Sequence, residues 1–142
     1  MSTAKPVELR VVLDSNVYVS AFTHPQGRLF QLWRQALQCR YQLLVSPAIV
    51  NEVGDVLRLK FGWDDSRISA RLKLLAKVAE IVMPMTTLQV IMEDEDDNRI
   101  LECAVTGKAD LIVSSDNHLR RLKTYQGIGI VHPIDFRRTL GI

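Results

Sequence analysis

Short apolar runs, each followed by polar residues and then by helical periodicity, constrain the fold of this chain most. Residues 7–13 end in the continuously apolar Val11-Val12-Leu13, and residues 111–113 form a second such run, as expected of strands covered on both faces of a parallel sheet. Further strands are expected at residues 41–45, 79–83 and 128–131. This alternation with helices predicts an α/β fold with a mainly parallel sheet of about five strands, flanked by helices on both faces and joined by right-handed crossovers.

Apolar residues at helical spacing mark the helices between these strands. Ser46-Pro47 is a strong start signal, because serine caps a helix and proline suits its first position. Helices are expected at residues 17–22 (one short turn), 28–38, from Pro47 to the Phe61-Gly62 break, from Asp64 or Asp65 to Ala79, 98–106 and 117–123. Residues 85–92 are expected to form an extended connection or a short strand.

Length and composition favour one globular domain over residues 1–142, with residues 1–6 as a flexible tail. The chain is 47% hydrophobic and 24% charged, and no apolar run approaches the roughly 20 residues that a membrane span needs. Its start lacks an apolar signal-peptide core, so a cytoplasmic location is expected. Cys39 and Cys103 lack the spacing of a zinc site or a disulfide framework and are interpreted as structural thiols.

Carboxylates from separate segments are expected at one edge of the sheet. Asp14 and Asp116 directly follow two predicted strands, and in open parallel sheets ligands bind at the carboxyl ends of the strands. Glu52 shares a helix stripe with Ile49 and Val56, which turns it inward. The sequence therefore predicts that these three acids share the carboxyl edge.

The acidic run from Glu93 to Asp97 contributes one further acid to this edge. Asp97 stands three, four and seven residues before Ile100, Leu101 and Ala104 and therefore shares their buried face. Asp96 is rotated by about 100° from it, and the acids before Asp96 are expected at or before the helix cap.

A cluster of carboxylates repels itself, and a divalent cation is the usual resolution. Oxygen ligands favour Mg²⁺ or Mn²⁺, which suits metal-assisted hydrolysis of phosphodiester bonds. Capping or solvated roles remain the alternative for each acid taken singly. The predicted ligands and catalytic residues are Asp14, Glu52, Asp97 and Asp116, while Asn16, Ser115 and Asp96 are candidates to orient them, although turn formation explains Asn16 and Ser115 about as well.

The motifs that carry these acids resemble those of PIN-domain ribonucleases. They are Val11-Val12-Leu13-Asp14-Ser15-Asn16-Val17, Glu52 after Ser46-Pro47, Asp94 to Ala104, and Ala109 to Asp116. The resemblance is strongest to the branch of toxin components of bacterial toxin–antitoxin systems (VapC-like) and extends from Val11 to about Phe136. One departure is Ser114-Ser115, where the family commonly has Thr-Gly or Thr-Arg.

The resemblance implies a Rossmann-like three-layer α/β/α sandwich and Mg²⁺- or Mn²⁺-dependent cleavage of single-stranded RNA. It also implies inhibition by a cognate antitoxin and formation of a homodimer. The family's conserved acids fall on the same four positions. Three cationic residues near the acidic edge are candidates to bind RNA, although a solvated helix face explains them equally well: Arg120, Arg121 and Lys123. Two aromatic residues near Asp14, Tyr18 and Phe22, are candidates to stack on a base, but core packing is the better explanation for Phe22.

Two other classes of function remain open. One is a non-catalytic PIN-type module that binds RNA or protein. The absence of one of the four acids would favour this class, but all four acids are present. Aspartyl-phosphate phosphatases and receiver domains also begin with an Asp after the first strand, but the phosphatases need a second Asp where this chain has Asn16. No P-loop, serine-hydrolase or zincin motif occurs, and His24, His118 and His132 show no metal-ligand spacing.

Overall fold

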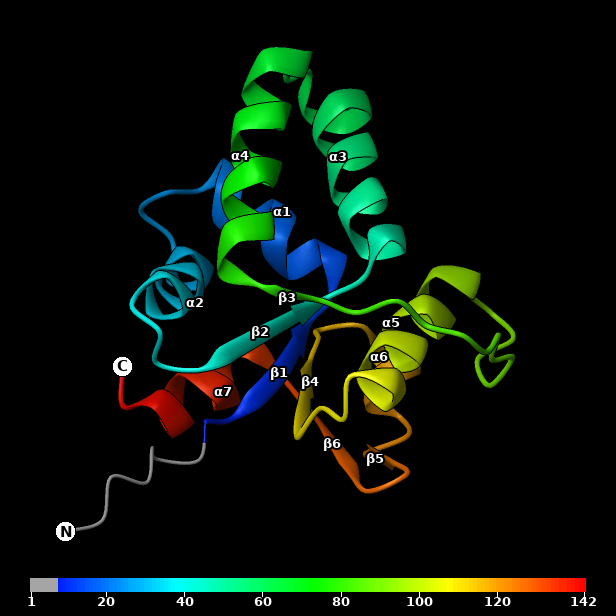
Figure 1. Cartoon of the computed structure of the whole chain (residues 1–142). Coiled ribbons are helices and arrows are strands. Elements are labelled where there is room, and N and C mark those ends of the chain that lie inside the picture. Colours follow the sequence, from blue (N-terminus) through cyan, green and yellow to red (C-terminus); the bar gives the residue numbers. More distant parts are fainter. Residues whose placement is uncertain (1–7) are drawn as a thin grey trace, which may run out of the picture.

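The computed structural model describes residues 8–142 (Figure 1). The tail expected at residues 1–6 and the start of the first strand at Val7 lie outside the described residues. None of the helices in residues 8–142 is long and apolar enough to cross a membrane.

A six-stranded, mainly parallel sheet forms the centre of the molecule, with strand order β3-β2-β1-β4-β6-β5. All neighbouring pairs are parallel except β5 and β6, which form an antiparallel hairpin. The predicted parallel sheet is confirmed, and the hairpin strand β5 adds one member to it. The strands are β1 (Arg10–Leu13), β2 (Gln42–Val45), β3 (Glu80–Ile81), β4 (Leu111–Val113), β5 (Thr124–Tyr125) and β6 (Ile128–Val131).

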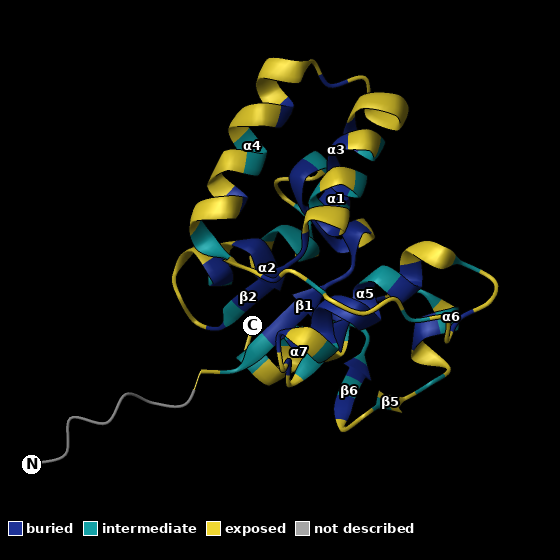
Figure 2. Cartoon of the chain, turned by 45° about the vertical axis from the view of Figure 1, so that its right-hand side comes forward, coloured by how far each residue is buried: buried dark blue, intermediate teal, exposed yellow. Residues whose placement is uncertain are grey.

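Helices cover both faces of this sheet, which confirms the predicted α/β/α sandwich. In Figure 1, α1, α2 and α7 lie on one side of the strands and α5 on the other, with α6 beside α5. The α3–α4 hairpin extends away from the sheet, and most of its outer surface is exposed (Figure 2). The helices are α1 (Ser15–Thr23), α2 (Arg28–Leu37), α3 (Pro47–Phe61), α4 (Asp65–Val78), α5 (Glu95–Thr106), α6 (Asn117–Arg120) and α7 (Pro133–Leu140).

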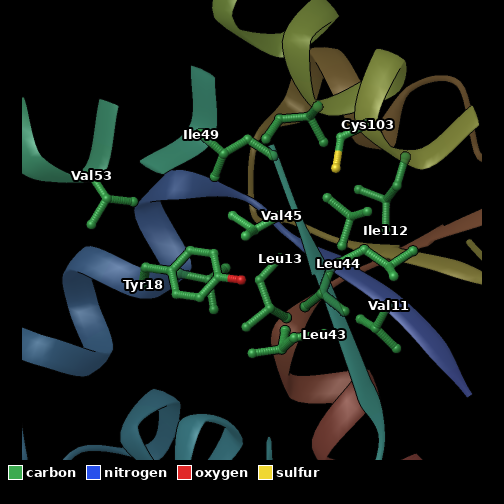
Figure 3. Close-up of a cluster of buried hydrophobic side chains, with 14 of the residues drawn as sticks. Val11, Leu13, Tyr18, Leu43, Leu44, Val45, Ile49, Val53, Cys103 and Ile112 are labelled. Carbon is green, nitrogen blue, oxygen red and sulfur yellow. The ribbon is translucent and has the colours of Figure 1, made fainter. Parts of the chain in front are cut away.

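The core lies between the strands and these helices. Val11, Val12 and Leu44 are fully buried, as their continuously apolar runs predict. Figure 3 shows Tyr18 of α1 and Cys103 of α5 packing against the strands from different sides. Burial of apolar surface from both layers therefore fixes the strands, and with them the edge at which they end.

Local signals in the sequence set the ends of the α3–α4 hairpin. The Ser46 hydroxyl accepts a hydrogen bond from the Ile49 N–H at 3.4 Å. Gly62 ends α3 in the left-handed conformation, with φ 67°, which glycine adopts without steric cost. Asp64 then caps α4 by accepting a hydrogen bond from the Arg67 N–H at 2.7 Å. The helix start at Pro47 and the break at Gly62 are confirmed.

Residues 85–92 form an irregular connection and no regular strand, which agrees with the first of the two expected alternatives. Side chains of α5 hold this connection. The Asn98 carboxamide oxygen accepts hydrogen bonds from the Val90 and Ile91 N–H groups at 3.0 and 2.8 Å, and Glu102 accepts one from Leu88 at 2.8 Å. Local periodicity cannot reveal a segment whose partners lie on a distant helix.

The structure differs from the expectation at two places, after β4 and after β6. The helix expected at residues 117–123 ends at Arg120, and a turn with Lys123 at φ 60° leads into β5. Pro133, expected only to close a strand, occupies the first turn of α7, where His132 caps the helix by accepting a hydrogen bond from the Ile134 N–H at 3.1 Å. A cap followed by proline is a helix start signal, and it was overlooked.

Candidate functional site

The ends of β1 and β4 bring Asp14 next to Ser114. Leu13 pairs with Val113 in the parallel register, and the Asp14 N–H donates to the Val113 carbonyl at 2.9 Å. The buried Ser114 hydroxyl donates a hydrogen bond to Asp14 Oδ2 at 2.6 Å. Burial raises the pKa of Asp14, and the Ser114 hydrogen bond opposes this rise without cancelling it. Asp14 is therefore a buried carboxylate held in one orientation.

Glu52 approaches the same region from the second turn of α3. Its side chain is half-buried, and its Oε2 accepts a hydrogen bond of 2.6 Å from the Ser15 hydroxyl. Burial raises the pKa of Glu52, and the negative charges of Asp96 and Asp14 raise it further. The inward orientation predicted from helical phase agrees with this contact.

Asp97 lies in the first turn of α5, after the capping residue Asp94. It is only 4% exposed, and its Oδ2 atom has no hydrogen-bond partner within residues 8–142. Burial, followed by the neighbouring Asp116 carboxylate, raises the pKa of Asp97 to about 8. The negative charge of Asp116 thus opposes ionisation of the Asp97 carboxyl group.

Asp116 follows β4 and caps α6. Its Oδ1 accepts hydrogen bonds from the His118 and Leu119 N–H groups at 2.7 and 3.2 Å. Its own N–H donates to the Ser114 hydroxyl at 2.9 Å, so Ser114 connects Asp14 with Asp116. The Asp116 carboxylate also contributes to the raised pKa of both Asp14 and Asp97.

The residues expected to orient these acids occupy different positions. Ser115 is exposed, and the preceding serine, Ser114, makes the hydrogen bond to Asp14. Asn16 is also exposed, and the nearby backbone N–H groups of Asn16 and Ser15 lower the pKa of Asp14. Asp96 is exposed and acts on Glu52 only through its charge. The orienting roles of Asn16, Ser115 and Asp96 stay predictions.

The proposed nucleic-acid contacts divide into exposed cations and buried rings. Arg120 and Lys123 are exposed near α6, while Arg121 is exposed and pairs with Glu93 at 2.8 Å. Tyr18 and Phe22 are 0% and 2% exposed, so neither ring can stack on a base, and that suggestion is wrong.

Three residues of the site were missed as partners of the acids: Ser15, Ser114 and His118. The two serines are adjacent in sequence to predicted acids or strand ends. The register of β1 and β4 brings Ser114 to Asp14, and the packing of α1 against α3 brings Ser15 to Glu52. The His118 Nδ1 atom lies 4.0 Å from Asp97 Oδ2 and 3.8 Å from Asp116 Oδ1. The signal for His118 was its position two residues after Asp116, in the helix turn that Asp116 caps.

The donor set fits a divalent cation. Asp97, Asp116 and His118 each offer a ligand atom, and these three atoms lie within 4.8 Å of one another. Asp97 Oδ2 is buried without a partner, and a carboxylate in that state needs either a proton or a positive charge. Carboxylate oxygens are preferred ligands of Mg²⁺ and Mn²⁺.

The fold and site define a class: α/β sandwich proteins with acidic side chains gathered at the carboxyl edge of a parallel sheet. Residues 10–118 match the family model described as the PIN domain, so the chain belongs to the PIN-domain family. It is also similar to an uncharacterized protein of Methanocaldococcus jannaschii, at 30% identity over 128 residues that cover 87% of this chain and 81% of the relative.

Two solved structures share the fold at low sequence identity. VapBC2 from Rickettsia felis, crystallised with a DNA fragment from its promoter, matches with a TM-score of 0.63 at 14% identity over 87% of this chain and 98% of that one. PAE2754 from Pyrobaculum aerophilum matches with a TM-score of 0.59 at 17% identity over 94% of this chain and 90% of that one.

Proposed function

We propose that this protein is a metal-dependent endoribonuclease that cleaves single-stranded RNA, with Mg²⁺ or Mn²⁺ as cofactor, and that it is the toxin of a toxin–antitoxin pair. The observation that carries the proposal is the meeting of acids at one edge of the sheet: Asp97 and Asp116 each offer a ligand atom within 4.8 Å of the other, and Ser114 links Asp116 to the buried Asp14. Membership of the PIN-domain family supports the same conclusion. Acids that meet in this way are suited to binding a cation and a phosphodiester together.

The chain's own residues would prepare the reaction by fixing carboxylate positions. Ser114 and Ser15 donate to Asp14 and Glu52, so these acids keep their orientation without a ligand. Asp97 and Asp116 face each other, and their repulsion favours a cation between them. A bound cation would supply activation of the attacking water and charge stabilisation of the phosphate at this site.

Single-stranded RNA is the substrate that best suits a recessed acidic site. Asp14 and Asp97 are 5% and 4% exposed, so a flexible strand reaches them more easily than a rigid duplex. Exposed Arg120 and Lys123 could attract the RNA backbone beside these acids.

Exposed apolar side chains support a protein partner, either an antitoxin or a second copy of the chain. Leu59 on α3 is 81% exposed, and Met85 and Met92 in the segment before α5 are 93% and 81% exposed. A surface that another protein covers often exposes apolar side chains close together, so we propose Met85 and Met92, seven residues apart in one segment, as the first candidates for such a contact. The structure of a VapBC assembly among the similar folds agrees with this proposal.

Cleavage of labelled RNA tests the proposal. The purified protein should cut single-stranded RNA with Mg²⁺ or Mn²⁺, lose this activity in EDTA and leave duplex RNA largely intact. Asp14→Asn and Asp116→Asn should each abolish cleavage while circular dichroism shows that the fold persists. If both variants cut RNA as fast as the wild type, the assigned site is wrong. If the wild type binds RNA without cutting it, the non-catalytic binding module is the correct function.

A further inference from the structure

We propose that His118 is a ligand of the cation site formed with Asp97 and Asp116, and that its imidazole nitrogen makes this site favour Mn²⁺ over Mg²⁺. The inference rests on the proposed function for the presence of a cation. It goes further by adding a nitrogen ligand and by naming the preferred ion.

The backbone of His118 is held by the turn that Asp116 caps. The His118 N–H donates to Asp116 Oδ1 at 2.7 Å, which holds the start of α6 against the carboxylate. The ring then directs Nδ1 toward both acids, at 3.8 Å from Asp116 Oδ1 and 4.0 Å from Asp97 Oδ2. A direct hydrogen bond from imidazolium to carboxylate would be about 2.7–2.9 Å long, so the ring faces both acids without bonding to either.

These separations suit atoms that share one ion. Two ligand atoms that are each about 2.1 Å from a metal lie about 3–4 Å apart, depending on the angle between their bonds. The two histidine–carboxylate distances fall in the upper part of this range, so a rotation of the exposed His118 side chain toward the acids would bring Nδ1 to a ligand position.

The Asp97 carboxylate provides the second indication of a ligand. Its Oδ2 atom, the one nearest to His118 Nδ1, is buried without a hydrogen-bond partner within residues 8–142. In contrast, the His118 side chain is 39% exposed. The site therefore has a buried oxygen without a partner on one side and a solvent-exposed ring on the other. An ion can enter from the exposed side.

The nitrogen donor determines the preferred metal. Mg²⁺ prefers all-oxygen coordination, whereas first-row transition metals bind imidazole well. Mn²⁺ also favours oxygen ligands, but as a transition metal ion it accepts an imidazole in place of a water more readily than Mg²⁺ does. Coordination by His118 should therefore strengthen Mn²⁺ binding more than Mg²⁺ binding.

Electron paramagnetic resonance on the full chain with Mn²⁺ tests this assignment without any cleavage assay. The wild-type spectrum should show coupling between the bound Mn²⁺ and a ¹⁴N nucleus, and this coupling should be absent in His118→Ala. The variant should also bind Mn²⁺ about tenfold or more weakly, while its affinity for Mg²⁺, measured by competition, changes less than threefold. His24→Ala is the matched control, because His24 is an exposed histidine directly after α1 and its loss should leave both affinities and the nitrogen coupling unchanged.

Each alternative outcome has a clear meaning. Bound Mn²⁺ with no nitrogen coupling in the wild type would overturn the assignment of His118 while leaving the proposed metal-dependent nuclease intact. Equal weakening of Mg²⁺ and Mn²⁺ in His118→Ala would refute the metal preference. No Mn²⁺ binding by the wild type would contradict the proposed function itself. If His118→Ala and the wild type have the same Tm in EDTA, the variant is folded, and its weaker binding of Mn²⁺ comes from the loss of the imidazole.

Discussion

Asp97 is a carboxylate in surroundings that oppose its charge. It is nearly fully buried, one of its oxygens has no partner within residues 8–142, and Asp116 lies beside it. Burial and this neighbour raise its pKa to about 8, from about 4 in an unfolded chain. Between these two pH values the folded protein keeps a proton that the unfolded chain releases.

The pH dependence of stability follows from that difference in bound protons. Because the folded state binds more protons, the free energy of unfolding of the metal-free protein should fall as pH rises from about 4 to 8. Asp97→Asn removes the group responsible and should raise the stability of the metal-free protein at pH 8 by at least about 1 kcal/mol, or about 2–4 °C in Tm. The difference should disappear near pH 4. Differential scanning calorimetry in EDTA measures it.

Glu95→Gln is the matched control for Asp97→Asn, since Glu95 is an exposed acid in the same helical turn. It should not raise Tm at pH 8. A Tm for Asp97→Asn at or below the wild-type value at pH 8 would show that Asp97 is not held in an unfavourable charge state.

Ser114 and Ser115 offer a test of which serine supports the site. Ser114→Ala removes the hydroxyl that donates to Asp14 and accepts from the Asp116 N–H. It should cost about 1–3 kcal/mol of stability and weaken cation binding about 10–100-fold. Ser115→Ala should change neither, because the Ser115 side chain is exposed. Equal effects of both variants in urea unfolding and cation titration would contradict this account of the site.

At the scale of elements, α5 supports both the site and the segment before it. Asp97 faces the acids, and the next residue, Asn98, binds the backbone of residues 90 and 91. Its carboxamide accepts from two N–H groups and donates to the Ile91 carbonyl at 2.7 Å. One helix turn thus positions a candidate ligand and orders an irregular connection.

Asn98→Ala should therefore be strongly destabilising. It leaves two N–H groups and one carbonyl without their hydrogen-bond partner, and the expected cost is about 2–4 kcal/mol. Urea unfolding measures the loss, with Gln89→Ala as the control because Gln89 is an exposed residue of the same segment. A loss for Asn98→Ala no larger than that for Gln89→Ala would mean that backbone contacts alone hold this connection.

Elements with strong local signals could be predicted from the sequence, and those held by distant side chains could not. The apolar runs of β1, β2 and β4 and the Ser46-Pro47 start of α3 were sufficient for correct assignment. Strand β5 has only two residues and depends on its pairing with β6. Residues 85–92 depend on Asn98 and Glu102.

The same distinction applies to the candidate site. Strand ends and helical phase were enough to propose Asp14, Glu52, Asp97 and Asp116, because those signals are local. The contacts of Ser15, Ser114 and His118 depend on how separate elements approach one another, so the sequence alone did not show that Ser114 donates to Asp14 or that His118 lies near Asp97 and Asp116.

At the scale of the whole molecule, the parallel sheet brings residues that are far apart in sequence to one edge. Asp14 and Asp116 follow neighbouring strands, and α3 and α5 add Glu52 and Asp97. The central proposal is that these four carboxylates contribute to one cation site, in which Asp97 and Asp116 lie closest to the ion together with His118. Binding of a cation there should stabilise the folded chain, because unfolding separates the ligands.

Isothermal titration of Mn²⁺ into the wild type and single variants tests that claim most directly. The wild type should bind Mn²⁺, Asp14→Asn and Asp116→Asn should each lose at least about tenfold in affinity, and Asp135→Asn, at an exposed acid on α7, should bind as the wild type does. If Asp14→Asn and Asp116→Asn bind Mn²⁺ as tightly as the wild type, the four acids do not form one cation site.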